Sequence, residues 1–191
     1  RYTYRQALAW LAFYAVLALA PLGVVFVGRL PRGRTFWLEF GVGLGFVALS
    51  MMALQFVLTG RFRRFASGIG LDNMLQFHRQ AGMVAAVFLI AHPVVMIATR
   101  PGYRRFFDPR VNLPRALALT AVLGAIGLLV VSTLWRKRLG LSYEWWRLLH
   151  ALLALFIVFI GIVHVLQVGR YVRGPWKQLV WIGLTGGAMA L

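Results

Sequence analysis

Two stretches decide the fold of this chain: LQFHRQAGMVAAVFLIAHP at residues 75–93 and WWRLLHALLALFIVFIGIVH at residues 145–164. Each is mostly apolar, about 20 residues long, and contains two histidines fourteen positions apart. These are all the histidines of the chain, His78 with His92 and His150 with His164. Fourteen residues at 100° per residue return to within about 40° of the starting direction, and at 1.5 Å per residue they cover roughly 21 Å. Both histidines of a stretch therefore share one helix face at two different depths.

Apolar stretches of similar length recur along the chain, and arginines separate them. About 20 residues at 1.5 Å per residue cross the roughly 30 Å of hydrocarbon in a bilayer. We therefore predict an all-α integral membrane protein, a bundle of six transmembrane helices at about 7–28, 37–58, 74–98, 116–135, 144–168 and 176–191. The last is short by about a turn and position 1 is Arg. We expect a fragment whose C-terminal continuation is missing; a complete small protein with a frayed end is the alternative.

Composition supports a membrane protein. The 191 residues are 61% hydrophobic, against about 45–50% in soluble domains, and only 13% are charged. The net charge of +17 is typical of nucleic-acid binders. Here the basic residues form short clusters between charge-free stretches, which indicates headgroup contacts and no nucleic-acid partner. The absence of cysteine excludes disulfides, thiolate metal sites and iron–sulfur clusters.

Charge does not decide the orientation of the bundle, because the 21 Lys and Arg divide 10 to 11 between its two ends.

Local signals mark two helix starts. Asp72 or Asn73 is expected to cap the third helix, and Ser142 the fifth, with Glu144 in its first turn. No Asp or Glu lies within the apolar stretches, which argues against a proton relay or cation site in the membrane.

The helices with histidines are separated by one other helix, so they run parallel. If they are neighbours, His78 faces His150 at one depth and His92 faces His164 at the other. Two imidazoles meeting across such a gap supply both axial ligands of a haem iron. The prediction is two stacked b-type haems, each held by one histidine pair as its iron ligands.

Two other interpretations stay open. Histidines within a bundle also join helices by hydrogen bonds in a non-redox membrane protein. A zinc or copper site is the rival metal centre, but such an ion needs three or four converging ligands, and the fourteen-residue spacing disperses them.

Several neighbouring residues suit a macrocycle between helices. Gly82 and Gly161 lie on or beside the histidine faces, where a flat ring needs room, although glycines also serve close helix packing. Phe156, near the middle of its helix, is a candidate to fill the gap between two porphyrins. Four arginines are candidate partners for haem propionates or, alternatively, interfacial anchors. They are Arg79 and Arg147 beside the first pair, and Arg100 and Arg170 beyond the second.

These two stretches resemble the ferric reductase-like transmembrane domain, a superfamily that includes the NADPH oxidases and the ferric-chelate reductases. The resemblance implies six helices, a cytoplasmic N-terminus and, for this chain, a bacterial inner membrane. It also implies electron transfer from NAD(P)H through FAD, on a C-terminal dehydrogenase domain absent from this chain, to an inner haem at His78 and His150. From there electrons pass to an outer haem at His92 and His164, and then to oxygen or a ferric chelate. Phe156 matches an aromatic bridge between haems.

The chain departs from the oxidases at one position. Oxidases of this family often carry a further histidine one turn after the outer-haem ligand of the third helix, which is His92 here, and in this chain that residue is Met96. Superoxide production is therefore in doubt, and another acceptor stays open. The segment 100–115 has five arginines. It either attracts an anionic acceptor such as a ferric chelate or contacts headgroups.

An alternative function follows from a second resemblance. The chain is similar to the haem-bearing membrane partner of the bacterial periplasmic methionine sulfoxide reductase. Such a subunit takes electrons from a separate flavoprotein or quinone and supplies a periplasmic enzyme.

Overall fold

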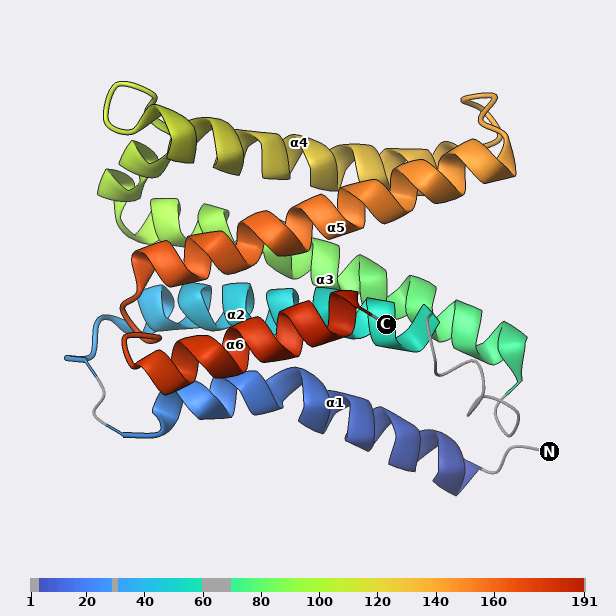
Figure 1. The fold of residues 1–191 in the computed structure, drawn as a ribbon, viewed down its shortest axis with the longest axis horizontal. Helices are drawn as coiled ribbons and strands as arrows, with labels where there is room; N and C mark the ends of the chain where they lie inside the picture. Colours follow the sequence, from blue (N-terminus) through green and yellow to red (C-terminus); the bar gives the residue numbers. More distant parts are fainter. Residues whose placement is uncertain (1–3, 29–30, 60–69, 191) are drawn as a thin grey trace.

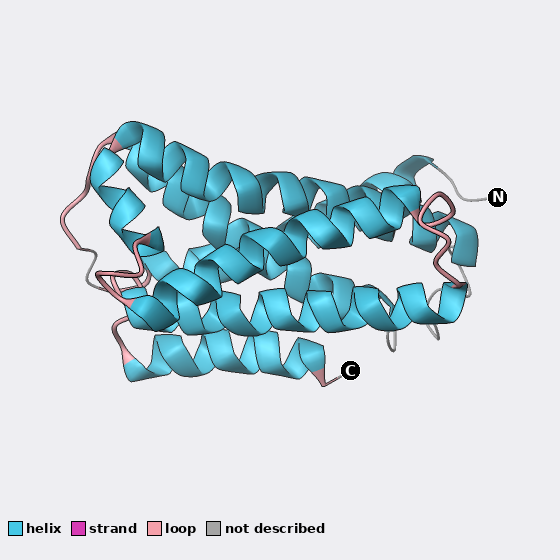
Figure 2. Ribbon diagram, turned by 90° about the horizontal axis from the view of Figure 1, so that it is seen from above, coloured by secondary structure: helices cyan, strands magenta, loops and turns pink. Residues whose placement is uncertain are grey.

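The computed structural model describes residues 4–28, 31–59 and 70–190. Its elements are all helical. They are α1 (Tyr4–Phe26), α2 (Phe36–Thr59), α3 (Leu71–Thr99), the 3₁₀ helix η3 (Pro101–Phe107), α4 (Leu113–Trp135), α5 (Tyr143–Val168) and α6 (Pro175–Met189). The long helices lie side by side along one axis (Figure 1), and the loops gather at the two ends of the bundle (Figure 2). Each long helix begins and ends within three residues of its predicted bounds.

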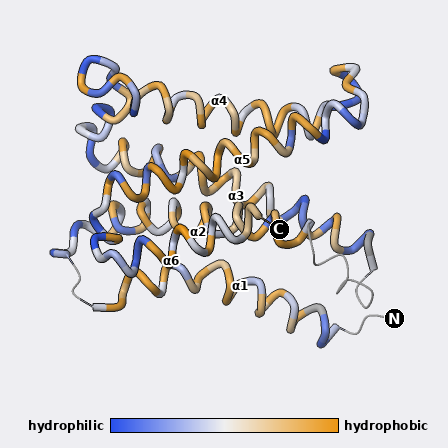
Figure 3. Tube along the Cα trace, in the orientation of Figure 1, coloured by the Kyte–Doolittle hydropathy of each residue, from blue (hydrophilic) through white to orange (hydrophobic). Residues whose placement is uncertain are grey.

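Within the described residues, five helices, α1 to α5, are long and apolar enough to cross a membrane. Hydrophobic residues occupy their middles, and hydrophilic residues gather at the helix ends and loops (Figure 3). α6 has 15 residues and stops partway along the bundle (Figure 1). The chain is therefore an integral membrane helical protein, and a sixth span remains a prediction.

Four helices form a ring. α2 packs against α3 and α5, and α4 packs against the same two helices. α3 and α5 face each other across this ring, and their backbones are not closely packed on one another. α1 and α6 lie against α2, which is the most buried helix. The ring thus leaves an interhelical space between the two helices that carry the histidines, as in helix bundles that hold cofactors in their cores.

One predicted helix start is confirmed and one is wrong. The Ser142 hydroxyl accepts a hydrogen bond from the Trp145 amide at the start of α5 (3.4 Å), with Glu144 in the first turn. α3 instead follows Gly70, whose φ of 84° favours glycine, and within the described part of the chain no side chain caps it. Asp72 consequently lies inside the first turn rather than at the cap.

Lys177 ties α6 to α1. Its ammonium donates a hydrogen bond to the Val25 carbonyl (2.9 Å), in the last turn of α1, where carbonyls have no partner within the helix. The lysine is only 7% exposed, and its charge lies 5.6 Å from the centroid of the Trp176 ring. A buried cation here satisfies an end carbonyl and complements the negative end of the helix dipole.

Lys177→Met should therefore lower the stability of the bundle by about 1–2 kcal/mol, because the side chain keeps its length but loses the cap and the charge. Thermal unfolding in detergent measures this. Lys137→Met, at an exposed lysine after α4, is the matched control and should stay within about 0.5 kcal/mol of wild type. Equal unfolding temperatures for the Lys177 variant and wild type would contradict the assignment.

Candidate functional site

The structure brings the four histidines together in two pairs, one from α3 and one from α5 in each. The ring centroids of His78 and His150 are 6.2 Å apart, with an interplanar angle of 56°. Those of His92 and His164 are 6.5 Å apart at 69°. The pairing across helices that the spacing predicted is therefore present at both depths.

These separations fit two imidazoles on opposite sides of one metal ion. Metal–nitrogen bonds of about 2 Å, with roughly 1.1 Å from each nitrogen to its ring centroid, place the two centroids about 6.3 Å apart. Among the described residues, no three His, Cys, Asp or Glu side chains gather where they could hold a metal ion. Each pair therefore offers two nitrogen ligands, the number of axial positions on a haem iron.

His92 is held by α2. Its Nδ1 lies 2.7 Å from the Gly41 carbonyl oxygen, which accepts only, so Nδ1 carries the proton and donates. Gly45, one turn further along α2, makes room for the ring, because a Cβ there would lie 2.9 Å from Nδ1. A metal-ligating histidine typically donates its second nitrogen to such an acceptor, which leaves Nε2 free to bind.

His150 is held in a similar way by α4. Its Nδ1 lies 3.3 Å from the Thr133 hydroxyl. Trp146, one turn earlier on α5, packs against the same imidazole with ring centroids 5.3 Å apart. Across the gap, the Nδ1 of His78 is buried with no hydrogen-bond partner among the described residues. Such an unpaired buried nitrogen is unusual in an ordinary packing histidine.

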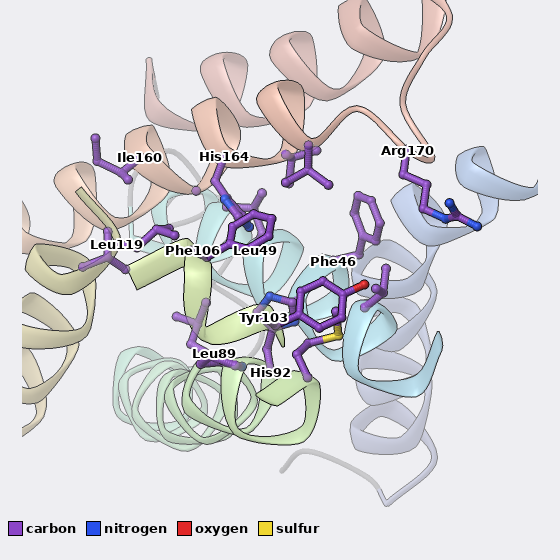
Figure 4. Close-up of a pocket in the computed structure, with 18 of the residues that line it drawn as sticks. Phe46, Leu49, Leu89, His92, Tyr103, Phe106, Leu119, Ile160, His164 and Arg170 are labelled. Atoms are coloured by element: carbon purple, nitrogen blue, oxygen red, sulfur yellow. The ribbon is translucent and has the colours of Figure 1, made fainter. Parts of the chain in front are cut away.

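A cavity of about 500 Å³ opens beside His92 and His164, within the range of small-molecule sites. Both imidazoles point into it (Figure 4). Phe106 of η3 packs against His164, with ring centroids 6.1 Å apart, and the Arg115 guanidinium lies 4.5 Å from the centroid of the Phe106 ring. The wall is mainly aliphatic, from residues including Leu49, Leu89, Val122, Ile126 and Ile157. The site is therefore a mainly apolar cavity, in which the aromatic ring of Phe106 packs beside His164.

Four arginines are among the residues that line this cavity. Arg100 and Arg170, both predicted from the sequence, line it together with Arg34 and Arg173. Arg170 donates to the Arg32 carbonyl (2.6 Å), while its Nε is buried and has no hydrogen-bond partner among the described residues. These groups form an electropositive rim next to His92 and His164, which suits carboxylates.

Four side chains, which we name the Glu39 clasp, fasten this end of the bundle: Arg34, Glu39, Tyr103 and Tyr171. Arg34 Nε lies 3.2 Å from the Glu39 carboxylate, and Arg34 also donates to the Tyr103 hydroxyl (2.8 Å). The Tyr171 hydroxyl donates to the same carboxylate. Burial lowers the pKa of Arg34, but its hydrogen bonds to Glu39 and Tyr171 outweigh this and raise it. The clasp joins the start of α2, η3 and the segment before α6.

Of the other residues predicted from the sequence, only Gly161 lines the cavity. Arg79 and Arg147 are exposed on the side of the His78–His150 pair. Gly161 lines the cavity, and a Cβ there would lie 2.8 Å from Leu49, whereas one at Gly82 would meet nothing within 4 Å. Phe156 is 36% exposed and is not among the residues that line the cavity. Its role between two porphyrins stays a prediction without support from this arrangement.

The residues midway between the two pairs are aliphatic. Ala85 lies seven positions from both histidines of α3, and Ile157 lies seven positions from both histidines of α5, which keeps each on the histidine face. They are 0% and 2% exposed. Ile157, the residue after Phe156, is therefore the one that lies midway between the two histidines on their face of α5.

The model of the family described as "Ferric reductase like transmembrane component" matches residues 44–161, more than half of the chain. The chain belongs to this family. Three of its four histidines lie inside the match, and His164 lies three residues beyond it. Membership of the ferric reductase-like family supports an oxidoreductase that acts in transmembrane electron transfer.

An uncharacterized protein of the archaeon Archaeoglobus fulgidus is 28% identical to this ferric reductase-like chain over 152 residues. The alignment covers 76% of this chain and 83% of the relative. No solved structure matches the chain significantly.

Proposed function

We propose that this chain carries electrons across the membrane through two bis-histidine b-type haems, one at each pair. The observation that carries the proposal is the spacing of the imidazole centroids, 6.2 and 6.5 Å, at two depths of the same helix pair. When bound, each haem supplies a one-electron iron couple, without any need for a proton path. Membership of the ferric reductase-like family supports the same function.

The chain's own residues have three tasks in this function. The two histidine pairs bind the haem irons, at heights roughly 21 Å apart along α3 and α5. The Gly41 carbonyl and the Thr133 hydroxyl orient one imidazole of each pair. Buried aliphatic side chains between the pairs, Ala85 and Ile157 among them, exclude water and keep the local dielectric low.

We further propose which groups stand at the two ends. The arginine rim at His92 and His164 holds the propionates of one haem and draws an anionic acceptor, such as a ferric chelate, to that side. This end is then extracytoplasmic, and the N-terminus and the His78–His150 pair face the cytosol, in a bacterial inner membrane. A flavin reductase domain or subunit, using FAD and NAD(P)H, is the donor on that side. The alternative function is that of a stand-alone membrane subunit that supplies electrons to a periplasmic reductase. It uses the same two haem sites.

Transfer across a membrane can be measured directly. Purified haem-loaded chain is placed in vesicles filled with ferricyanide, and dithionite is added outside. We expect loss of lumenal ferricyanide well above the rate of protein-free vesicles. His78→Ala, which breaks the path at one pair, should return the rate to that background. A colourless wild-type protein from cells supplied with haem, or a haem-loaded protein with only the background rate, would overturn the proposal.

A further inference from the structure

We infer that Thr133 is a positioning residue that fixes the orientation and ligand strength of His150. This rests on the proposed function, because the ligand strength of His150 has meaning only if it binds iron. Thr133 lies on α4, a helix without a histidine, near its C-terminal end. It was not among the residues that the sequence pattern selected.

The direction of the hydrogen bond follows from counting hydrogens. A threonine hydroxyl has one hydrogen and two lone pairs. The Thr133 oxygen lies 2.7 Å from the Leu129 carbonyl oxygen, which can only accept, so the single hydrogen points there. The contact with His150 Nδ1 at 3.3 Å must then be a donation from the imidazole to the hydroxyl oxygen. This selects the tautomer in which Nε2 of His150 is the unprotonated, ligating nitrogen.

The His150 ring is also fixed by its other neighbours. Trp146 packs against it at 5.3 Å and 44°, and Arg136 lies 6.0 Å from the centroid of the Trp146 ring. His78 faces it from α3 at 6.2 Å. Together with the Thr133 hydroxyl at Nδ1, the His150 ring therefore has neighbours on three helices, α3, α4 and α5.

An acceptor at Nδ1 gives the imidazole some imidazolate character and makes Nε2 a stronger electron-pair donor. A stronger donor favours ferric over ferrous iron and lowers the midpoint potential of that haem. At His92 the acceptor is the Gly41 backbone carbonyl, which no side-chain substitution removes. At His150 it is a side chain, so the His78–His150 pair is the one whose potential a single substitution should change.

The test uses Thr133→Val, which keeps the shape and removes the hydroxyl, with Thr133→Ala as a second variant lacking the same group. Redox titration by visible spectroscopy, with electron paramagnetic resonance of the ferric state, resolves the two haems. We expect two haems bound and one midpoint potential raised. Loss of a group that hydrogen-bonds to a metal ligand typically costs 10–100-fold in metal affinity or activity. Because the 3.3 Å contact is long, we expect an effect at the low end, a tenfold shift in the ratio of oxidised to reduced haem, which is about 59 mV for one electron.

Two controls separate this from a packing effect. Thr133→Ser keeps the hydroxyl and should restore the wild-type potential. Ser132→Ala changes the preceding residue, whose buried hydroxyl donates to the same Leu129 carbonyl (3.2 Å), and should leave both potentials unchanged. The shifted haem must also be the one that His150→Ala loses.

The outcomes distinguish this inference from the proposed function. If wild type binds no haem, the proposed function fails. If wild type and the Thr133 variants bind two haems and both potentials stay at wild-type values, the inference alone is overturned. A shift in the haem that His92→Ala loses overturns it as well.

Discussion

We expect His78→Ala and His150→Ala each to lose the same haem and keep the other, and His92→Ala and His164→Ala each to lose the haem that the first two variants keep. The reason is the pairing across α3 and α5, in which the centroid separations leave room for one iron between the two members of a pair. Removing either imidazole would leave a bound haem iron with one of its two histidine ligands. The two variants of a pair should therefore have the same difference spectrum and about half of the wild-type haem content.

Pyridine haemochrome content and redox titration of the purified variants provide the measurement. Gln80→Ala on α3 and Gln167→Ala on α5 are controls, because both side chains are exposed two or three residues from a histidine. Both controls should keep two haems. If His78→Ala and His92→Ala lose the same haem, the pairing runs along the helix instead, and the stacked arrangement is wrong.

Gly45→Ala is expected to weaken haem binding at the His92–His164 pair by about 10–100-fold, the usual cost of disturbing a ligand's supporting contacts. A Cβ at this position would lie 2.9 Å from His92 Nδ1, and the ring cannot retreat without losing its 2.7 Å hydrogen bond to Gly41. The effect does not come from a weaker helix. Alanine is favoured over glycine inside a helix by about 0.8–1 kcal/mol, so α2 itself should gain stability.

Gly43→Ala is the matched control, because a Cβ there meets nothing within 4 Å on the same helix. Haem titration of the apoprotein should give wild-type affinity at both sites for Gly43→Ala and at the His78–His150 site for Gly45→Ala. Wild-type affinity at both sites in Gly45→Ala, or an equal loss in both variants, would show that α2 does not support His92.

The sequence was sufficient for the helices. The pairing of the histidines needed, beyond their spacing, the assumption that the two helices with histidines are neighbours. Length and apolar composition locate each span, and the fourteen-residue spacing fixes which imidazoles share a depth. Arg100 and Arg170 line the cavity, as expected of residues that follow their histidines at the ends of the same spans, and their role toward haem propionates stays a prediction.

Residues that act from other helices could not be found this way. Thr133 reaches His150 from α4, and Gly41 reaches His92 from α2, 51 residues away in the chain. A threonine and a glycine in apolar helices carry no pattern that distinguishes them from packing residues. The link of Arg34 and Glu39 to Tyr103 and Tyr171 depends on how the ring of helices closes, which no local pattern in the sequence predicts.

The Glu39 clasp also sets an order in biosynthesis. Tyr171 follows Glu39 by 132 residues, so at usual rates of translation it leaves the ribosome on the order of ten seconds later. Of the two residues that bond to this carboxylate in the part of the chain that the structure describes, the nascent chain then contains Arg34 and lacks Tyr171. The turn between α4 and α5 at the opposite end is complete before Tyr171 is synthesised. The end of the bundle beside His92 and His164 is therefore fastened last.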